Sequence, residues 1–287
     1  MTTDSLFSNS SAAQSAARAL LSSIPGWRAR PAQLTPLHGG LQHDVYLVES
    51  IGYKYVLRVA SEVVAAGGGS RELECYLQQQ AAGQGLAAPV LFSDTRRGVI
   101  LMEYLHGQVL TPTELAAPDM LRELGELLRQ LHALPLCGVN FDPSAAADDY
   151  LAELGEDLPD SSIAQHCLDI IVATPRPRER RCCHNDLIAA NLIRGTTLRL
   201  IDFEYACDNE PMFDLASVLC WHNLGSDERD VLLQAYARNI TDDINARLDA
   251  QCRLFDALQW LWLAVRQRKR PEDWAGQQMV AVEQRLG

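Results

Sequence analysis

The first hundred residues group their apolar positions into short segments separated by glycine-containing turns. The β-branched and aromatic residues of these segments predict antiparallel strands. The predicted strands are 33–40, 44–50, 53–60 and two within 88–105. A helix from Ser70, a suitable N-cap, to about Gly83 interrupts them. A short helix over 11–24 is predicted ahead of the strands, after a loose terminus at residues 1–10.

From Thr111 onward the apolar positions recur every three or four residues, which indicates helices. The predicted helical stretches are 118–134, 161–173, 228–239 and 245–268. Residues 181–206 between them predict two short strands that flank a loop. Because the predicted strands precede most of the predicted helices along the chain, we expect an α+β fold with segregated layers. We expect an N-terminal antiparallel sheet lobe with one helix and a helical extension over residues 1–105, and a mostly helical C-terminal lobe over residues 106–287.

Charge and composition narrow the class of protein. The 287 residues are 47% hydrophobic and 22% charged, with a formal net charge of −12. A surface that coats nucleic acid would be basic, so this balance argues against a nucleic-acid partner, although it would suit a cationic ligand. The eight cysteines have no zinc-site spacing and predict reduced, buried thiols.

Two features that the sequence lacks indicate where in the cell the protein is expected. No apolar run reaches the ~18–20 residues needed to cross a bilayer, and the first residues lack the basic start and apolar segment of a signal peptide. We therefore expect a cytoplasmic protein without a membrane partner. The sequence leaves the oligomeric state open.

The residues that carry chemistry lie in the stretches HNDLIAANL and LRLIDFEYA. His184, Asp186 and Asn191 fall within eight residues, and Asp202 ends an apolar run farther on. A carboxylate at the end of a buried strand needs a partner, and a divalent cation with an added Asn oxygen is a suitable one. Asp186 is placed to accept a proton from a hydroxyl, which completes an arrangement used for phosphoryl transfer. The alternative, that these residues are loop caps and turn residues, requires four positions to match one mechanism by chance.

The N-terminal segments offer backbone groups to a nucleotide. Gly39 and Gly40 lie between two predicted strands, where their N–H groups can cover phosphates. Alone this signal is weak, because a Gly-Gly pair between strands is more often a plain hairpin turn. Glu103 and Leu105, at the predicted junction of the lobes, would present backbone groups to adenine.

A charged pair is also predicted in this half. Arg58 lies on a strand, and Glu72 lies at the start of the helix. A strand cation paired with a helix glutamate is how kinases hold the α- and β-phosphates. Glu74 competes for this pairing, and Glu72 is preferred because it directly follows an arginine.

These stretches together resemble the aminoglycoside phosphotransferase and choline kinase superfamily, and are most similar to choline/ethanolamine kinases and bacterial thiamine kinases. In motif order the resemblance spans residues 33–268. It implies a bilobal, protein-kinase-like fold, ATP as donor, magnesium as cofactor and a small alcohol as acceptor. The positions it matches are Asp186 for the catalytic base, Asn191 and Asp202 for the metal, Arg58 and Glu72 for the phosphates, and His184 and Asp214 for bracing the loop.

The acceptor is less well defined than the reaction. Trp221 stands where choline kinases carry an acidic residue, and Trp260 and Trp262 are two apart where those kinases have W-x-x-W. Trp221, Trp262 and Glu204 are candidates for a cation–π cage; core packing of the tryptophans is the alternative. The acceptor is expected to be a cationic alcohol such as choline, ethanolamine or thiamine. The alternatives are an aminoglycoside or sugar-like alcohol, or a nucleotide-binding pseudokinase without turnover.

Overall fold

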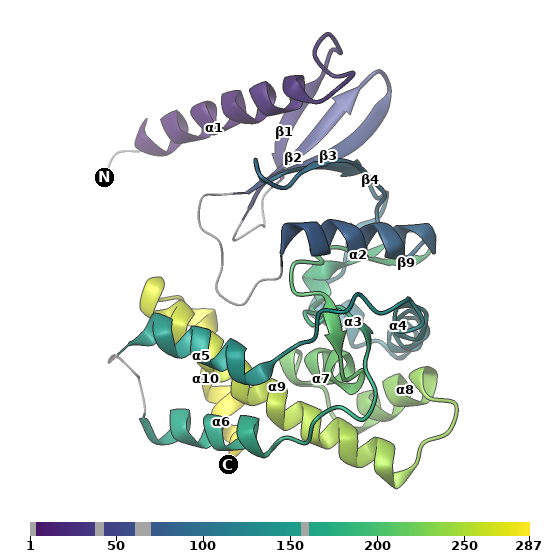
Figure 1. Ribbon diagram of the computed structural model, residues 1–287, viewed down its shortest axis with the longest axis vertical. Coiled ribbons are helices and arrows are strands. Elements are labelled where there is room, and N and C mark those ends of the chain that lie inside the picture. The colour runs from purple at the N-terminus through teal and green to yellow at the C-terminus, as the bar shows by residue number, and fades with distance from the viewer. Residues whose placement is uncertain (1–3, 38–42, 61–69, 156–160) are drawn as a thin grey trace. The chain divides into compact units, whose positions relative to one another are not determined.

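The computed structural model of the chain describes residues 4–37, 43–60, 70–155 and 161–287 (Figure 1). The predicted phosphate-covering residues Gly39 and Gly40 lie outside this part of the chain. The described residues form two compact units, one ending at His106 and the other running from Gly107 onward. Each unit is taken separately below. Within the described residues, no helix is both long and apolar enough to cross a membrane.

The N-terminal unit is built on a five-stranded antiparallel sheet, which agrees with the strands predicted from sequence. Its strands are β1 (Gln33–Leu37), β2 (His43–Ser50), β3 (Tyr53–Ala60), β4 (Val90–Asp94) and β5 (Val99–Glu103), in the order β1-β2-β3-β5-β4. Ile51 and Gly52 join β2 to β3, and both have positive φ, as a two-residue type I′ hairpin requires. The tight turn fixes the register of β3.

Two helices cover opposite faces of this sheet, as Figure 1 shows for α1 (Asp4–Ser23) and α2 (Arg71–Gly83). Side chains alternate along β3. Leu57 packs in the apolar cluster that α1 shares with the sheet, whereas Arg58 points to the other face and pairs with Glu74 of α2. One face of β3 therefore packs in the apolar core, and the other face carries the ion pair with α2.

Helix α1 corrects one prediction, because it begins at Asp4 and takes in most of the predicted loose terminus. Its C-terminal half places Ala17 and Leu21 against the sheet core. The serines and the one asparagine of the first turns have only mildly unfavourable helix propensity, so a helix anchored at its far end can extend through them.

The C-terminal unit is a helical assembly around a long buried helix. Its helices are α3 (Pro112–Leu115), α4 (Pro118–Leu131), α5 (Pro143–Leu154), α6 (Ser161–Ala173), α7 (Met212–Trp221), α8 (Ser226–Tyr236), α9 (Asp242–Lys269) and α10 (Asp273–Leu286). Helix α9 packs against α5, α6, α7 and α10. Trp260 is fully buried in the core that these helices share.

The segment predicted as two strands around a loop takes part in more strand pairing than expected. Strand β7 (Arg181–Cys183) pairs with β10 (Cys207–Asn209), and β6 (Gln108–Val109), β8 (Leu192–Arg194) and β9 (Leu198–Leu200) form a second small sheet. These strands of two or three residues are too short to give a readable alternation in sequence. They frame the loop of residues 184–191, which carries the predicted chemistry.

Candidate active site

Buried apolar residues hold both ends of the 184–191 loop. Cys182 and Cys183 of β7 and Leu192 of β8 are completely buried. Burial raises the pKa of the Cys182 thiol to about 12, so it stays protonated and acts as packing. Between them Asn185 has a φ of 65° and residues 189–191 form one turn of 3-10 helix. The left-handed residue, a conformation that Asn tolerates, turns the chain sharply before Asp186.

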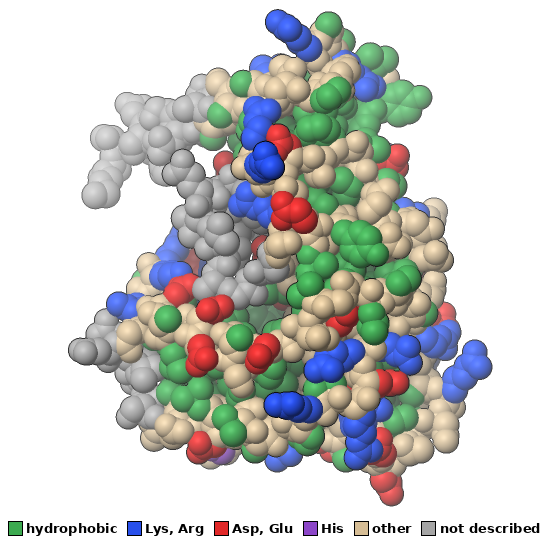
Figure 2. Space-filling view, in the orientation of Figure 1, with side chains coloured by type: hydrophobic (Ala, Val, Ile, Leu, Met, Phe, Trp, Pro, Cys, Tyr) green, Lys and Arg blue, Asp and Glu red, His purple; other side chains and the backbone are tan. Residues whose placement is uncertain are grey.

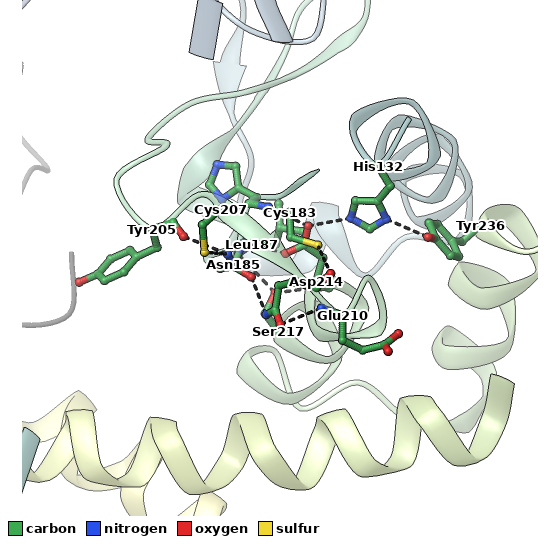
Figure 3. A network of polar contacts seen from close by, with 12 residues as sticks. His132, Cys183, Asn185, Leu187, Tyr205, Cys207, Glu210, Asp214, Ser217 and Tyr236 are labelled. Carbon is green, nitrogen blue, oxygen red and sulfur yellow. Dashed lines mark hydrogen bonds and ion pairs between the residues drawn. The ribbon is translucent and has the colours of Figure 1, made fainter. Parts of the chain in front are cut away.

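Asp214 of α7 anchors the start of this loop. Its buried carboxylate accepts hydrogen bonds from the backbone N–H groups of His184 (2.9 Å) and Asn185 (2.7 Å), and contacts His132 Nε2 at 2.9 Å. We assign Nε2 of His132 as the donor to this carboxyl group, and Nδ1 then faces the hydroxyl of Tyr236 at 2.8 Å. Figure 3 shows this chain of contacts running from α8 through α4 to α7 and the loop. Asp214 thus braces the loop, as its position in the sequence suggested.

Two side chains of the loop tie it to the segment that follows β9. His184 Nε2 donates to the carbonyl of Ile201 at 3.0 Å, and Asn185 Nδ2 donates to the carbonyl of Tyr205 at 2.9 Å. Asn185 Oδ1 in turn accepts from Asn209 Nδ2 at 2.8 Å. His184 is fully buried, and burial lowers its pKa. A neutral, buried ring bonded to a carbonyl holds position, so we assign His184 to bracing rather than to contact with a reactant.

Asp186 and Asn191 lie against each other. Asn191 Nδ2 donates to Asp186 Oδ2 (2.8 Å) and to its carbonyl (2.9 Å), which fixes the carboxylate across the loop. Burial, followed by the charges of Asp202 and Glu204, raises the pKa of Asp186 to about 7. The charges of two neighbouring carboxyl groups thus act on Asp186.

The donor set suits a hard divalent cation. Asp202 follows β9 with a φ of 67°, an uncommon conformation for a residue other than glycine, so its placement is imposed by the surrounding structure. Asn191 uses its nitrogen toward Asp186, and its amide oxygen is the atom that a cation would take. Oxygen ligands of this kind are those that magnesium prefers, and a cation would relieve the mutual repulsion of the carboxylates. The residues therefore fit the metal that the resemblance implies.

In the N-terminal unit the predicted partner of Arg58 is wrong by two residues. Arg58 pairs with Glu74, whose side chain is buried, while Glu72 is exposed and bonds to Thr95. Positions 72 and 74 lie about 200° apart on a helix, so only one can face the sheet. Glu74 shares the buried face with Leu77 and Ala81, at spacings of three and seven. That spacing was the sequence signal for the correct choice.

The residues predicted to meet adenine lie at the end of β5 and just beyond it. Glu103 ends β5 and donates its N–H to the carbonyl of Pro89 at 3.0 Å. The next residue, Tyr104, donates to the carbonyl of Lys54 at 3.4 Å, and Leu105 lies beyond it. The roles of Glu103 and Leu105 stay predictions.

The predicted acceptor tryptophans lie together, with a third that the sequence reading missed. Trp221 ends α7 and Trp262 lies on α9, with ring centroids 6.0 Å apart, and Trp274 of α10 lies 6.4 and 6.3 Å from them. Trp260 points away into the core and donates its Nε1–H to Glu283 at 3.0 Å. Of the two tryptophans of α9, Trp262 therefore lies beside Trp221 and Trp260 does not, and the acceptor role of Trp262 stays a prediction. Glu204 acts on Asp186 through its charge, which places it at the loop.

The net negative charge does not by itself mark an acceptor site. Figure 2 shows acidic and basic side chains interspersed over the face it displays, with no single large acidic patch there. Recognition of a cation on this chain has to be sought in particular side chains.

Comparison with known proteins places the chain among phosphotransferases. A model of the phosphotransferase enzyme family matches residues 33–270. Protein LicA of Haemophilus influenzae is 30% identical over 210 residues, which are 69% of this chain and 61% of the relative. The chain thus spans less than two thirds of that relative's length. A second Protein LicA, from the Rd strain, is 30% identical over 66% of this chain and 74% of its own length.

Two solved structures share the fold. A choline/ethanolamine kinase family protein from Mesorhizobium loti has a TM-score of 0.75 at 24% identity, covering 95% of this chain and 93% of its own. The choline kinase LicA from Streptococcus pneumoniae has a TM-score of 0.76 at 20% identity, covering 95% and 98%. The predicted α+β, kinase-like fold is confirmed.

Proposed function

The chain belongs to the phosphotransferase enzyme family, and we propose that it transfers the γ-phosphoryl group of ATP to the hydroxyl of a small cationic alcohol such as choline, ethanolamine or thiamine. The observation that carries the proposal is the position of Asp186, which is fixed by Asn191 within a loop that Asp214 anchors through two backbone donors. A carboxylate held in this way is suited to orienting a hydroxyl and accepting its proton.

The chain's own residues divide the work. Asp186 accepts the proton of the acceptor hydroxyl. Asn191 and Asp202 would hold magnesium, which when bound supplies positive charge to the phosphate oxygens. In the N-terminal unit, Arg58 is positioned by Glu74 and is suited to binding donor phosphate oxygens, since a guanidinium offers several donors in a fixed plane. Most of the rate gain would come from positioning and charge rather than from covalent chemistry.

The cationic acceptor is supported by the three tryptophan rings of α7, α9 and α10, because indole faces attract cations. The relatives named choline kinase agree with this choice. An aminoglycoside or an amino sugar would also bring positive charge, so these compounds belong in the same test.

The test is ATP consumption with magnesium across a panel of choline, ethanolamine, thiamine, aminoglycosides and amino sugars. We expect turnover with one of the small cationic alcohols and none with Asp186→Asn. Nucleotide binding without turnover on the whole panel would instead indicate a pseudokinase.

A second measurement tests the donor side. Glu74→Gln should raise the KM for ATP about 10-fold, because Arg58 loses its charged partner, while Glu72→Gln, the matched change on the exposed face, should leave it unchanged. Equal effects of the two variants would contradict the role given to Arg58 and Glu74.

A further inference from the structure

Two of the cysteines meet where α7 packs on α9, a pair of helices that Figure 1 shows together. Cys220 lies in the last turn of α7 and is buried, whereas Cys252 lies on α9 and is partly exposed. The Cys220 sulfur lies 3.7 Å from the backbone carbonyl oxygen of Cys252, and the two thiols also contact each other. Thiols in contact lie within reach of disulfide geometry.

Charged side chains of α9 and α10 surround this pair. Asp256, one helical turn after Cys252, lies within hydrogen-bond reach of the Cys220 thiol. Arg285 binds the carboxylate of Asp256 through Nε (3.0 Å) and Nη2 (2.6 Å), and its positive charge acts on both thiols. A cation beside a thiol favours the nucleophilic thiolate, and a neighbouring carboxylate can accept the thiol proton.

The pair consists of an accessible thiol and a buried thiol that can react with it. Contact with the Cys252 thiol, followed by burial, raises the pKa of Cys220, which therefore stays protonated until it reacts. Cys252 is partly exposed, so a dissolved oxidant reaches it first. An accessible cysteine near a positive charge, with a second cysteine in contact, is typical of reversible thiol oxidation.

We propose that Cys220 and Cys252 are a site of reversible oxidation, at which a hydroperoxide converts the two thiols into a disulfide between α7 and α9. With hydrogen peroxide, the Cys252 sulfur attacks one oxygen, the O–O bond breaks, and a sulfenic acid and one water form. The Cys220 sulfur then attacks the Cys252 sulfur and the S–O bond breaks. The Cys220 proton passes through Asp256 to the departing hydroxide, which leaves as a second water. The two thiols lose two electrons, and the peroxide gains them.

A disulfide here acts on the candidate active site through the end of α7. The residue after Cys220 belongs to the tryptophan cluster, which consists of Trp221, Trp262 and Trp274. The next residue, His222, accepts a hydrogen bond at Nε2 from the backbone N–H of Ala189 in the 184–191 loop, at 3.2 Å. Because a disulfide holds its sulfurs about 2.0 Å apart, it draws the end of α7 toward α9 and shifts both contacts. Oxidation therefore lowers turnover of the acceptor.

The direct test maps the cysteines of the full chain after treatment with hydrogen peroxide. Free thiols are alkylated with iodoacetamide before digestion and mass spectrometry. We expect a cross-linked peptide that joins Cys220 to Cys252, and dithiothreitol should remove it. Cys75→Ser is the matched control, because Cys75 is also partly exposed but lies on α2, in the other unit. The cross-link should form in this variant as in the wild type.

The order of the two steps is tested with Cys220→Ser, which keeps a hydroxyl beside Asp256 but cannot resolve a sulfenic acid. Dimedone, which reacts with sulfenic acids, should label Cys252 in this variant at least about fivefold more than in the wild type. If the serine variant does not fold, Cys220→Ala replaces it. Cys252→Ser should form no cross-link.

Thermal unfolding and turnover measure the consequence. Cys220 and Cys252 are 32 residues apart, so the disulfide should raise the melting temperature by about 3 °C or more, and dithiothreitol should reverse the change. Oxidised wild type should lose at least about threefold in kcat/KM for its acceptor, whereas peroxide should leave the activity of Cys252→Ser unchanged.

A peroxide-treated wild type without the cross-link would overturn the proposal, as would Cys252 oxidised to sulfinic acid while Cys220 remains alkylated. A cross-link that leaves turnover unchanged would overturn its effect on the active site. The cross-link is mapped without substrate, so a failure of the proposed function leaves that measurement decisive for the oxidation site.

Discussion

The 184–191 loop and the tryptophan cluster belong to the same unit but are held in different ways. The loop depends on Asp214, a fully buried carboxylate with three donors, and on two side-chain bonds to the following segment. The cluster depends on rings whose centroids lie about 6 Å apart and on one partly exposed ion pair between Arg266 and Glu272, and Trp274 is 37% exposed. The position of the loop is thus fixed by several independent hydrogen bonds, whereas the cluster has fewer contacts that fix its position. This contrast suits an enzyme that keeps its reaction while its acceptor changes.

The largest effect should come from the group at the centre of the loop. Asp186→Asn keeps the shape of the side chain but removes the proton acceptor, so we expect kcat to fall by at least ~10²-fold. Circular dichroism and urea unfolding should show a folded protein. The exposed change Asp119→Asn is the control. Full activity in Asp186→Asn would remove the loop from the reaction.

The next largest effect should come from the anchor of the loop. Asp214→Asn places an amide nitrogen where backbone donors now point, so we expect the free energy of unfolding to fall by about 2–4 kcal/mol. Because the loop loses its anchor, kcat should fall about 10-fold or more while the KM for the acceptor changes little. Urea unfolding and steady-state kinetics measure the two changes. A stable, active Asp214→Asn would show that the loop is held by its other contacts.

A pair of tryptophans tests the comparison directly. Trp260→Phe removes volume and a hydrogen bond from the core and should lower the free energy of unfolding by about 1–3 kcal/mol without altering the KM for the acceptor. Trp274→Phe should do the reverse, with a loss below about 0.5 kcal/mol and a KM for a cationic acceptor raised about 2–5-fold. If both variants affected stability alone, the cluster would be an extension of the core.

Acid pH should weaken the hydrogen bond between Ala189 and His222, which connects the 184–191 loop to the end of α7 beside Trp221. Burial lowers the pKa of His222 to about 4, from an ordinary value of about 6.5, and its Nε2 must be unprotonated to accept from Ala189. The unfolded chain therefore binds this proton at higher pH than the folded chain. The free energy of unfolding should fall by about 1–2 kcal/mol from this group between pH 7.5 and 5. His222→Gln, which does not titrate, should reduce that pH dependence in urea unfolding; an identical slope would contradict this origin.

The smallest effect is expected at the outer end of the loop's hydrogen-bond chain. Tyr236→Phe removes only the hydroxyl that faces His132 Nδ1, so we expect a loss of about 1 kcal/mol of stability and less than about threefold in kcat. A loss comparable to that of Asp214→Asn would mean that the hydroxyl, rather than the carboxylate, sets the loop.

The loop could be predicted from sequence because its residues lie within one short stretch with a distinctive spacing. Asp186, Asn191 and Asp202 were singled out in this way, and their roles stay predictions. His132 and Tyr236 were not, because they are 82 and 104 residues from the groups they contact and their own neighbours show only helical periodicity. No local pattern encodes such long-range pairs.

The same distinction between local patterns and long-range contacts explains which other features the sequence did not predict. Trp274 joins the cluster only through the packing of α10 on α9, which sequence spacing does not reveal. The choice between Glu72 and Glu74 was different, because the apolar period of α2 contained the answer. The strands of the N-terminal sheet, though not their order, followed from apolar segments and turns, the kind of local signal that sequence carries well.

The alternation along β3 also limits how this gene can change in length. Leu57 and Arg58 are neighbours that serve opposite faces, so the loss or gain of one codon within Tyr53–Ala60 would exchange their environments. A guanidinium would enter the apolar core while a leucine met Glu74, and stability and the proposed phosphate binding would be lost in one event. Substitutions here act one at a time, but insertions and deletions act on both properties together. Length variation among relatives should therefore be found in the turns of this sheet and not in β3.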